Sequence, residues 1–417
     1  MAVHFNPNMY FMKKVLFNLL ILSFPAIVTA QGFQINLQGQ KQQAMGGTAS
    51  ALAQDGASLF YNPGAVSFLK ENSVSLGTST VMASSRYTDA PSGNVSKTES
   101  PVGFPFTGYA VLGKQHEKLK YGLAVYTPFG SVIKWEDAWT GRFVITELKL
   151  QTIFIQPTIS YKISEKIGIG AGFVYGLGTL DLQSDLPIFM GDGKFSSMQL
   201  HGKGHGYGFN AGIYYEPVKK LSFGLTYRSQ VNLDFKDGQA TYTVPPSMEA
   251  DFPSGNVSTK MPLPGTLSLA TAYKPSEKFT TAFEMTMVGW KSYDTLSYDF
   301  ENNTYAVSDM KLARNYKNTF SYRVGAEYKL SDKVAARAGL KYLATPVKEG
   351  FVTPEVPDAN HFSYSAGLGY KLNNKLSADL SFTYERIQRT DNNQQVQLNG
   401  SYDTQLLIPG ISLNYAF

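Results

Sequence analysis

The chain has 417 residues, of which 17% are charged, with a formal net charge of +5 and no cysteine. The missing cysteines exclude disulfides, thiolate metal sites and a cysteine nucleophile, and the small net charge gives no reason to expect a nucleic-acid partner. The mean hydropathy of -0.18 is too polar for a bundle of membrane helices, so any membrane signal must lie in alternating strands.

Residues 1–30 have the pattern of a secretory signal peptide. Two lysines precede the short apolar segment from Val15 to Val28, and a small-x-small cleavage site follows before Gln31. The segment is shorter than the ~20 apolar residues that a membrane helix needs. We therefore predict an exported protein whose mature chain begins at Gln31.

Residues 31–72 show no alternation of apolar and polar residues. They are rich in small residues from Ala44 to Ala53 and then read Leu59-Phe60-Tyr61-Asn62-Pro63-Gly64. Compact helical turns with an Asn-Pro stop would plug a barrel whose bore otherwise admits water. The alternative, a loose periplasmic leader, would carry more charge and proline. We predict a hatch over residues 31–72.

From residue 73 to residue 417 the recurring pattern has a period of two. In one example, Leu376, Ala378, Leu380, Phe382 and Tyr384 alternate with polar residues, which gives a strand one apolar and one polar face. About 14 such segments of roughly 10–15 residues occur, a number and length within the range of outer-membrane barrels. They begin near residues 73, 105, 119, 149, 166, 205, 219, 262, 277, 315, 332, 360, 374 and 405.

Short and long connections alternate between these segments. The short ones fall near residues 117, 164, 217, 276, 332 and 373, and the long ones run approximately over 86–104, 130–148, 181–204, 235–261, 291–314, 345–359 and 389–404. Short periplasmic turns with long extracellular loops are typical of outer-membrane barrels, whereas a soluble sandwich would share only the alternation. The predicted fold is all-β: a transmembrane antiparallel β-barrel of about 14 strands, occupying 73–417, with an N-terminal hatch of short helices plugging the lumen.

The two faces of the predicted strands differ in charge. Every charged residue in the clearest segments takes the polar parity, which predicts a lumen that is charged and wet in its lower part: Arg323, Glu327, Arg337, Lys341, Asp379 and Glu385. Tyrosines recur at the strand ends that face the short turns, where an aromatic girdle belongs: Tyr161, Tyr215, Tyr273, Tyr328, Tyr370 and Tyr415. The alternative explanation is the ordinary β-propensity of tyrosine.

The last strand ends the chain at Phe417. Ile411, Leu413, Tyr415 and Phe417 share one face. A terminal phenylalanine after alternating apolar residues resembles the signal read by the barrel-insertion machinery, which we expect to be a partner.

Several motifs along the mature chain resemble the FadL-type outer-membrane transporters. They occur in the family's order: Gln31-Gly32-Phe33-Gln34, Leu59-Phe60-Tyr61-Asn62-Pro63, Tyr126-Thr127-Pro128-Phe129-Gly130, Trp139-Thr140-Gly141-Arg142-Phe143, the run from Leu263 to Ala270, Gly289-Trp290, Tyr316-Lys317-Asn318-Thr319-Phe320, Arg337-Ala338-Gly339, Thr345-Pro346-Val347 and Pro357-Asp358-Ala359-Asn360-His361. Two positions depart from the family pattern. Gly64 stands where alanine is usual, and Asn360-His361 stands where Asp-Arg is common.

The resemblance implies a transporter of long-chain fatty acids or similar lipophilic compounds, with an apolar cargo site between hatch and barrel. Cargo would enter from the extracellular loops and leave sideways at a kinked third strand. In that scheme Phe33 and Phe129 contact cargo, and Gly32, Asn62 and Pro63 belong to the hatch. We expect a monomer in the outer membrane of a Gram-negative bacterium, in contact with its lipid and without a cofactor or metal.

Prolines independently indicate a weak seam in the predicted barrel. Pro128 ends the third predicted strand, with Gly130 beside it, and Pro157 lies inside the fourth. Because proline cannot donate to the ladder, it is confined to edges, bulges and broken pairings. We predict a lateral gate at Pro128, Gly130 and Pro157; the alternative is that both prolines merely end strands near the rim.

Apolar residues in the long loops are candidates for capturing cargo. Leu186, Ile188, Phe189 and Met190 lie in the third predicted long loop, and Trp135 and Trp139 lie in the second. The alternative is a loop folded on itself.

Two other classes of function remain open from the sequence. A general diffusion porin would enter its first strand almost at once, and a barrel protease or lipase would need a Ser, His and acid constellation. His201 and His205 could suggest a metal site, but no carboxylate sits at ligand spacing beside them in the sequence, and a flexible polar loop explains them better. We predict no enzymatic activity.

Overall fold

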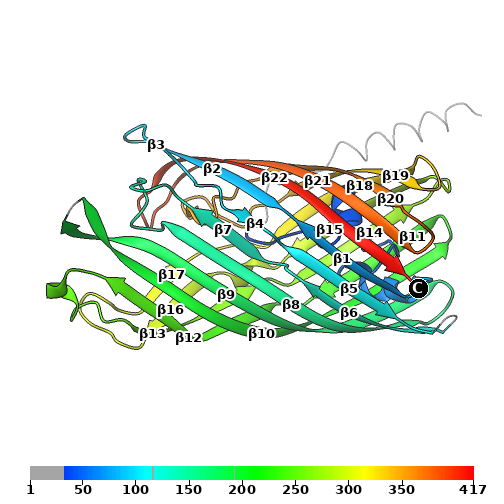
Figure 1. Cartoon of the computed structure of the whole chain (residues 1–417), viewed down its shortest axis with the longest axis horizontal. Coiled ribbons are helices and arrows are strands. Elements are labelled where there is room, and N and C mark those ends of the chain that lie inside the picture. The colour runs from blue at the N-terminus through cyan, green and yellow to red at the C-terminus, as the bar shows by residue number, and fades with distance from the viewer. Residues whose placement is uncertain (1–31, 115–116, 192) are drawn as a thin grey trace, which may run out of the picture.

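The computed structural model describes residues 32–114, 117–191 and 193–417, and the predicted signal peptide lies outside this range. The described strands close into one antiparallel β-barrel of 14 strands, several of which are broken into two shorter segments (Figure 1). The first half of the barrel contains β1 (Ser73–Ser79), β2 (Val81–Asp89), β3 (Val95–Lys97), β4 (Val102–Gly103), β5 (Phe106–Leu112), β6 (Leu119–Tyr126), β7 (Gly130–Lys134), β8 (Glu147–Lys162), β9 (Ile167–Gly191), β10 (Lys194–Val218) and β11 (Leu221–Arg228).

The second half completes the cylinder. It contains β12 (Val231–Thr243), β13 (Gly255–Leu263), β14 (Thr266–Tyr273), β15 (Phe279–Val288), β16 (Thr295–Phe300), β17 (Met310–Ala313), β18 (Thr319–Lys329), β19 (Val334–Leu343), β20 (His361–Lys371), β21 (Leu376–Asn392) and β22 (Asn399–Ala416). Closure occurs where β1 pairs with β22, with Val74 opposite Tyr415. A closed sheet leaves no edge strand whose backbone groups would meet lipid without a partner. The predicted 14-stranded barrel is confirmed.

The alternating side chains give the barrel wall an apolar outer face and a polar inner face, as the sequence indicates. Along β21, Leu380 and Phe382 are exposed on the outside, while Asp379, Ser381 and Thr383 are buried on the inside. The six predicted girdle tyrosines all lie on the outer surface with 41–51% of their area exposed. Among the described residues, no helix is long and apolar enough to cross a membrane.

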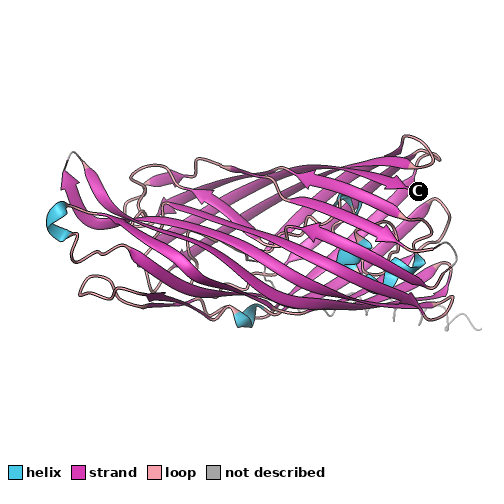
Figure 2. Cartoon of the chain, turned by 60° about the horizontal axis from the view of Figure 1, so that its bottom comes forward, coloured by secondary structure: helices cyan, strands magenta, loops and turns pink. Residues whose placement is uncertain are grey.

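The five described helices are short. α2 (Gln40–Ala44), α3 (Ser58–Tyr61) and η1 (Pro63–Phe68) belong to the segment before β1, whereas η2 (Pro246–Met248) and η3 (Trp290–Ser292) lie in later connections. The first three lie inside the barrel, in the half that holds the C-terminus (Figures 1 and 2). α2 packs against β19, β20 and β21, and η1 packs against β8, β9 and β10. The segment from Gly32 to Asn72 therefore fills the lumen, and it is called the hatch below.

Polar groups on the wall hold the hatch in place. Glu284 Oε2 accepts hydrogen bonds from the backbone N–H groups of Ala49 and Ser50, both at 3.0 Å. The fully buried Asn62 donates to Ser50 O at 2.6 Å and to Ile213 O at 3.0 Å, and it accepts from Gly64 N at 2.9 Å. Because Pro63 has no N–H, it can begin η1 without leaving a donor unpaired.

The charged lumen residues face inward as predicted, but the lower lumen is not open to water. Arg337 lies 2.6 Å from both Glu327 Oε2 and Asp379 Oδ1, and Arg323 lies 3.5 Å from Glu284 Oε1. These side chains are buried beneath the hatch. The expectation of a wet lower lumen was therefore wrong, since the hatch occupies the space and the charges pair with one another.

Most of the predicted long loops instead contain paired strands, and three of them show this clearly. In place of loop 181–204, β9 and β10 remain paired up to Gly191 and Lys194. In place of 235–261, β12 pairs with β13, and within 291–314, β16 pairs with β17. Pairing satisfies the backbone hydrogen-bonding groups within the connection itself. The polar and glycine-rich sequence of these hairpins conceals the alternation.

Wall glycines allow the hatch backbone to approach the strands closely. A Cβ atom added to Gly339 would lie 2.0 Å from Gly46 N, and one added to Gly64 would lie 2.7 Å from the carbonyl oxygens of Gly168 and Gly212. The departure of Gly64 from the family alanine follows from this contact, because an alanine would collide with the backbone of β9 and β10.

A Gly339→Val substitution is therefore predicted to displace the hatch and to raise the ion conductance of the protein in planar bilayers. The matched control is Gly108→Val, because a Cβ at Gly108 would meet only Leu76 Cδ2 at 3.4 Å and Val125 O at 4.0 Å. Equal conductance of the two variants would contradict this seating of the hatch.

The start of the hatch is tied to a carboxyl group in the connection between β19 and β20. Asp358 Oδ2 accepts from Gly32 N at 2.7 Å and from Thr345 Oγ1 at 3.1 Å. Burial is the largest influence on this carboxyl, and it raises the pKa of Asp358 from 3.8 to about 6. Between these two values the folded chain holds a proton that the unfolded chain releases.

The stability that this group contributes is complete below about pH 3.8 and is lost as the pH rises through about 6. From pH 4 to pH 7, the free energy of unfolding should fall by at most about 3 kcal/mol more in the unsubstituted protein than in Asp358→Asn, which cannot titrate. Urea unfolding at several pH values measures this difference. Parallel pH profiles for the two proteins would exclude the effect.

Candidate functional site: a cavity at a break in the barrel wall

The third strand of the barrel is interrupted at Thr127-Pro128-Phe129, between β6 and β7. Below the interruption β6 pairs with both of its neighbours, β5 and β8. Above it, β7 pairs with β8 alone, while β4 on the other side pairs with β2 alone. The barrel wall is therefore unpaired between its second and third strands.

This unpaired stretch has a definite lower and upper limit. The last contact below it joins Phe106 N to Thr127 Oγ1 at 3.1 Å. Above it, Glu99 N donates to Lys134 O at 2.8 Å and Glu136 N donates to Lys97 O at 3.0 Å. Residues 100–105 on one edge and 128–133 on the other are called the window.

Both edges of the window contain residues that cannot donate to a ladder. Pro101 and Pro105 lie on one edge and Pro128 lies on the other. The hatch supplies the missing partners from inside, because Ile35 N donates to Pro128 O at 2.8 Å and Gly130 N donates to Phe33 O at 3.1 Å. The predicted seam residues Pro128 and Gly130 thus lie at the window.

Pro157 lies elsewhere. It pairs in register with Leu123 of β6, so the wall between the third and fourth strands stays closed there. On its other side the ladder between β8 and β9 is interrupted only from Ile155 to Thr158. The structure therefore places the break at Pro128 and not between the two prolines.

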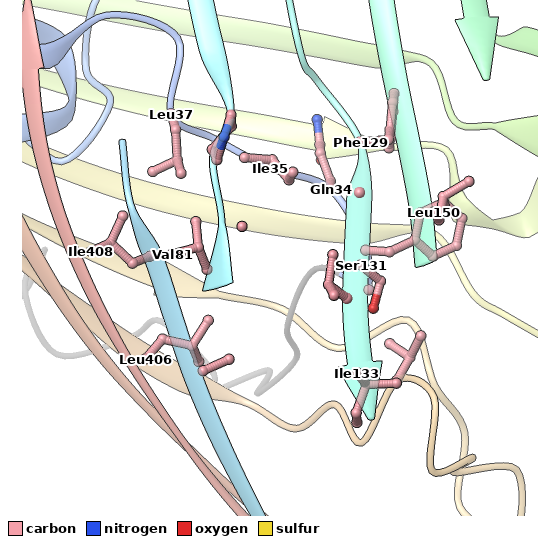
Figure 3. A pocket seen from close by; sticks show the side chains of 18 of the residues that line it. Gln34, Ile35, Leu37, Val81, Phe129, Ser131, Ile133, Leu150, Leu406 and Ile408 are labelled. Atoms are coloured by element: carbon pink, nitrogen blue, oxygen red, sulfur yellow. The ribbon is translucent and has the colours of Figure 1, made fainter. Parts of the chain in front are cut away.

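A cavity of about 370 Å³ lies behind the window. Its inner lining includes Ile35 and Leu37 of the hatch, Val81 of β2 and Ile408 of β22 (Figure 3). Its lining also includes side chains on the lipid-facing side of the wall, where 67% of Phe104, 39% of Phe106 and 36% of Ile153 is exposed. The cavity is therefore lined by residues from both sides of the wall.

Phe33 and Phe129 both line this cavity. The rings of the two residues lie 6.1 Å apart, and Phe33 also packs edge-on against Trp290 at 4.9 Å and Tyr293 at 5.3 Å. The preceding residue, Gly32, has a φ of 61°, and a Cβ there would lie 2.8 Å from the Trp290 ring. Glycine at position 32 therefore allows this aromatic packing.

The cavity lining includes a group of charged side chains from β19, β20 and β21, and uncharged polar residues such as Ser85, Thr98 and Gln151 line it elsewhere. Lys341 and Glu385 project from β19 and β21, and His361 and Asp358 lie at and just before the start of β20. Lys341 Nζ lies 3.8 Å from Glu385 Oε1, and His361 Nε2 lies 3.5 Å from Glu385 Oε2. The cavity is therefore lined by apolar residues together with charged groups, with Glu355 as a further carboxylate, and such polar groups can orient a ligand.

The structure places Trp135 and Trp139 away from any open surface. Their rings are stacked 4.4 Å apart and are only 2% and 1% exposed. Trp139 packs against Tyr87, and Trp135 packs against Tyr402. These tryptophans cannot serve as an exposed landing site in this conformation, because their loop folds onto itself.

Leu186, Ile188, Phe189 and Met190 lie at the far end of β9, on the hairpin that extends beyond the barrel. Phe189 is 61% exposed and Met190 is 42% exposed. The Phe189 ring lies 6.0 Å from that of Phe195. None of these four residues lines the cavity, so they form a separate apolar surface.

His201 and His205 lie within β10 and not in a loop. His201 Nδ1 lies 2.5 Å from Asp181 Oδ1 on β9, a partner that the sequence spacing did not indicate. Within the described ranges, no group of three or more His, Cys, Asp or Glu residues could hold a metal ion.

Sequence reasoning missed several residues of the window and the cavity. Pro101 and Pro105 could have been found, since Ser-Pro-Val-Gly-Phe-Pro spans the end of the predicted long loop 86–104 and the start of the second predicted strand. Lys341 and Glu385 were identified only as lumen-facing charges. The inner wall formed by Val81, Leu406 and Ile408 carries no local signal, because any lumen-facing aliphatic residue has the same pattern.

Comparison with known proteins gives the same architecture. The family model described as outer membrane protein transport protein (OMPP1/FadL/TodX) matches residues 21–417. The chain is 23% identical over 335 residues to the long-chain fatty acid transport protein of Salmonella typhi, covering 72% of this chain and 74% of that one.

Two solved structures have the same fold. The crystal structure of a Pseudomonas aeruginosa FadL homologue superposes with a TM-score of 0.79 at 20% identity, covering 93% of this chain and 100% of the other. The Ralstonia pickettii toluene transporter TbuX gives 0.72 at 16% identity, with 92% and 99% covered. The chain therefore belongs to the OMPP1/FadL/TodX family of outer membrane transport proteins and is a transport barrel of the bacterial outer membrane.

Proposed function

We propose that this protein captures hydrophobic small molecules at its extracellular end, binds them in the cavity between hatch and wall, and releases them sideways through the window. The observation that carries the proposal is the lining of the cavity by both lumen-facing and lipid-facing residues. An apolar solute can thus leave the protein into the hydrocarbon of the bilayer without crossing a polar layer.

The relatives support a hydrophobic cargo for this protein, but they do not agree on one compound. One relative is a fatty acid transport protein, and one similar structure is a toluene transporter. The apolar lining of the cavity suits either an acyl chain or an arene. The exposed hairpin residues Phe189 and Met190 remain candidates for the first contact with cargo, since an exposed apolar cluster favours binding.

The lateral route can be tested by cross-linking the edges of the window. We expect a Gly103→Cys, Ser131→Cys variant, joined by a flexible bifunctional thiol reagent, to lose most uptake of labelled oleate and toluene. The chain has no native cysteine that could compete for the reagent. Both positions line the cavity.

The matched control uses the same two strands below the window. Leu112 and Tyr121 are register partners in the closed ladder, and both are exposed on the outside. Cross-linking Leu112→Cys to Tyr121→Cys should leave uptake unchanged. Full uptake in the cross-linked window variant would rule out the lateral route.

A general diffusion porin is the second candidate, and the filled lumen argues against it. Arg228 anchors the hatch from the wall, donating to Phe60 O at 2.7 Å and to Tyr126 OH at 2.7 Å. We expect the unsubstituted protein to pass little ionic current in planar bilayers. A large, steady conductance would favour the porin.

Two further partners follow from the sequence. The exposed Phe417 ring lies 5.9 Å from that of Tyr415, and we infer that this outward-facing aromatic pair contacts the barrel-insertion machinery. The outer surface would contact membrane lipid directly, and we infer that the protein acts as a monomer.

A further inference from the structure

The outer face of the barrel changes from apolar to charged along neighbouring strands. β3, β2, β22 and β21 lie side by side, with β3 at the end of the barrel away from the C-terminus (Figure 1). Met82 of β2 and Leu407 of β22 are register partners, and 39% and 41% of their areas are exposed. Four residues further toward the extracellular end, Arg86 lies opposite Asp403 with the same outward parity. The apolar surface that faces hydrocarbon therefore ends between these two pairs, and the charged surface above it lies at the depth of the lipid head groups.

Three cations gather at this boundary. Arg86 has Asp403 opposite it on β22 and Lys97 opposite it on β3. Arg386 of β21 donates from Nε to Asp403 Oδ1 at 3.1 Å and from Nη2 to Asp403 Oδ2 at 2.7 Å. The side chains of all three cations are exposed. Arg86, Lys97 and Arg386 are called the basic cluster, and they share a single carboxylate within their own strands.

The carboxylates beside the basic cluster already have partners. Asp403 Oδ2 also accepts from Gln388 Nε2 at 3.0 Å, and Glu136 Oε1 accepts from the backbone N–H of Lys97 at 3.1 Å. Within the described ranges, the side chains of Arg86 and Lys97 form no hydrogen bond or ion pair. Like charges directly opposite each other destabilise an antiparallel pair of strands. An anion that reached Arg86 and Lys97 from outside the barrel would remove this repulsion.

We propose that the basic cluster binds the phosphate groups of the glycolipid that forms the outer leaflet of the bacterial outer membrane. The guanidinium groups of Arg86 and Arg386 match phosphate, since their N–H donors form a planar fork that can bond two oxygens at once. A soluble anion would use only the cations, whereas a phosphorylated lipid also covers the apolar surface around Met82 and Leu407. This site lies on the outer face of the wall, so it goes beyond the proposed cargo route and does not depend on it.

The apolar surface beneath the basic cluster continues to the edge of the window. Met82 of β2 pairs with Val102 of β4, which is 44% exposed, and the nearby Phe104 is 67% exposed. The acyl chains of a glycolipid whose phosphates are held by Arg86 and Lys97 would therefore lie beside the window. The bound lipid would form part of the hydrocarbon that borders this gap in the ladder.

The test measures binding of lipid A to the purified mature chain in a non-ionic detergent with a chelator of divalent cations, by microscale thermophoresis. We expect the unsubstituted protein to bind bisphosphorylated lipid A more tightly than the same lipid after its phosphates are removed. An Arg86→Gln, Lys97→Gln variant should lose about tenfold or more of the affinity for the phosphorylated lipid, because each cation near a lipid surface strengthens the binding of anionic head groups. Its affinity for the dephosphorylated lipid should not change.

The matched control is Lys219→Gln, Lys220→Gln, which removes the same charge from two exposed lysines in the short turn between β10 and β11. This variant should bind phosphorylated lipid A as the unsubstituted protein does. An equal loss of affinity in both double variants would overturn the site, since any positive charge on the protein would then serve.

Two further ligands distinguish the source of the phosphate. Phosphatidylglycerol and inorganic phosphate should both bind more weakly than bisphosphorylated lipid A. If either bound as tightly, the assignment of the glycolipid would be wrong. Equal affinity of the unsubstituted protein for phosphorylated and dephosphorylated lipid A would also overturn the proposal. None of these results bears on the transport of hydrophobic cargo, which the cross-linked window variant tests separately.

Discussion

The structure depends on one constraint: every backbone N–H and C=O group at membrane depth must have a partner. A closed ladder meets this requirement almost everywhere in the wall. It fails at the window, where β7 and β4 do not pair with each other and three prolines remove donors, and the ladder between β8 and β9 is also interrupted beside Pro157. At the window the hatch takes over, since Ile35 and Phe33 bond to the backbone of Pro128 and Gly130.

This arrangement makes the hatch part of the barrel wall as well as its plug. The segment that fills the lumen also completes the hydrogen bonding of the kinked third strand. Arg228 adds a second link, because it bonds both to Phe60 of the hatch and to Tyr126, the last residue before the kink. We therefore expect that moving the first residues of the hatch would break the hydrogen bonds that it makes to the backbone of the window.

The charged side chains of the lumen also have structural roles. Most lumen charges pair with one another or hold the hatch, as Arg337 and Glu284 do. In the cavity lining, Lys341 lies beside Arg323 in the sheet and 3.8 Å from Glu385 Oε1.

The sequence by itself determined the strand count, the inward parity of the charges, the outer tyrosines and the hatch, because period-two alternation and composition are local properties of the chain. The proline pattern also indicated Pro128 and Gly130, whereas Phe33 and Phe129 were named through the family resemblance. Only the tertiary structure decided that Pro157 stays in a closed ladder, that Trp135 and Trp139 are buried, and that Lys341 meets His361 and Glu385 at one cavity. Those facts depend on register and on contacts between distant strands, which no local pattern encodes.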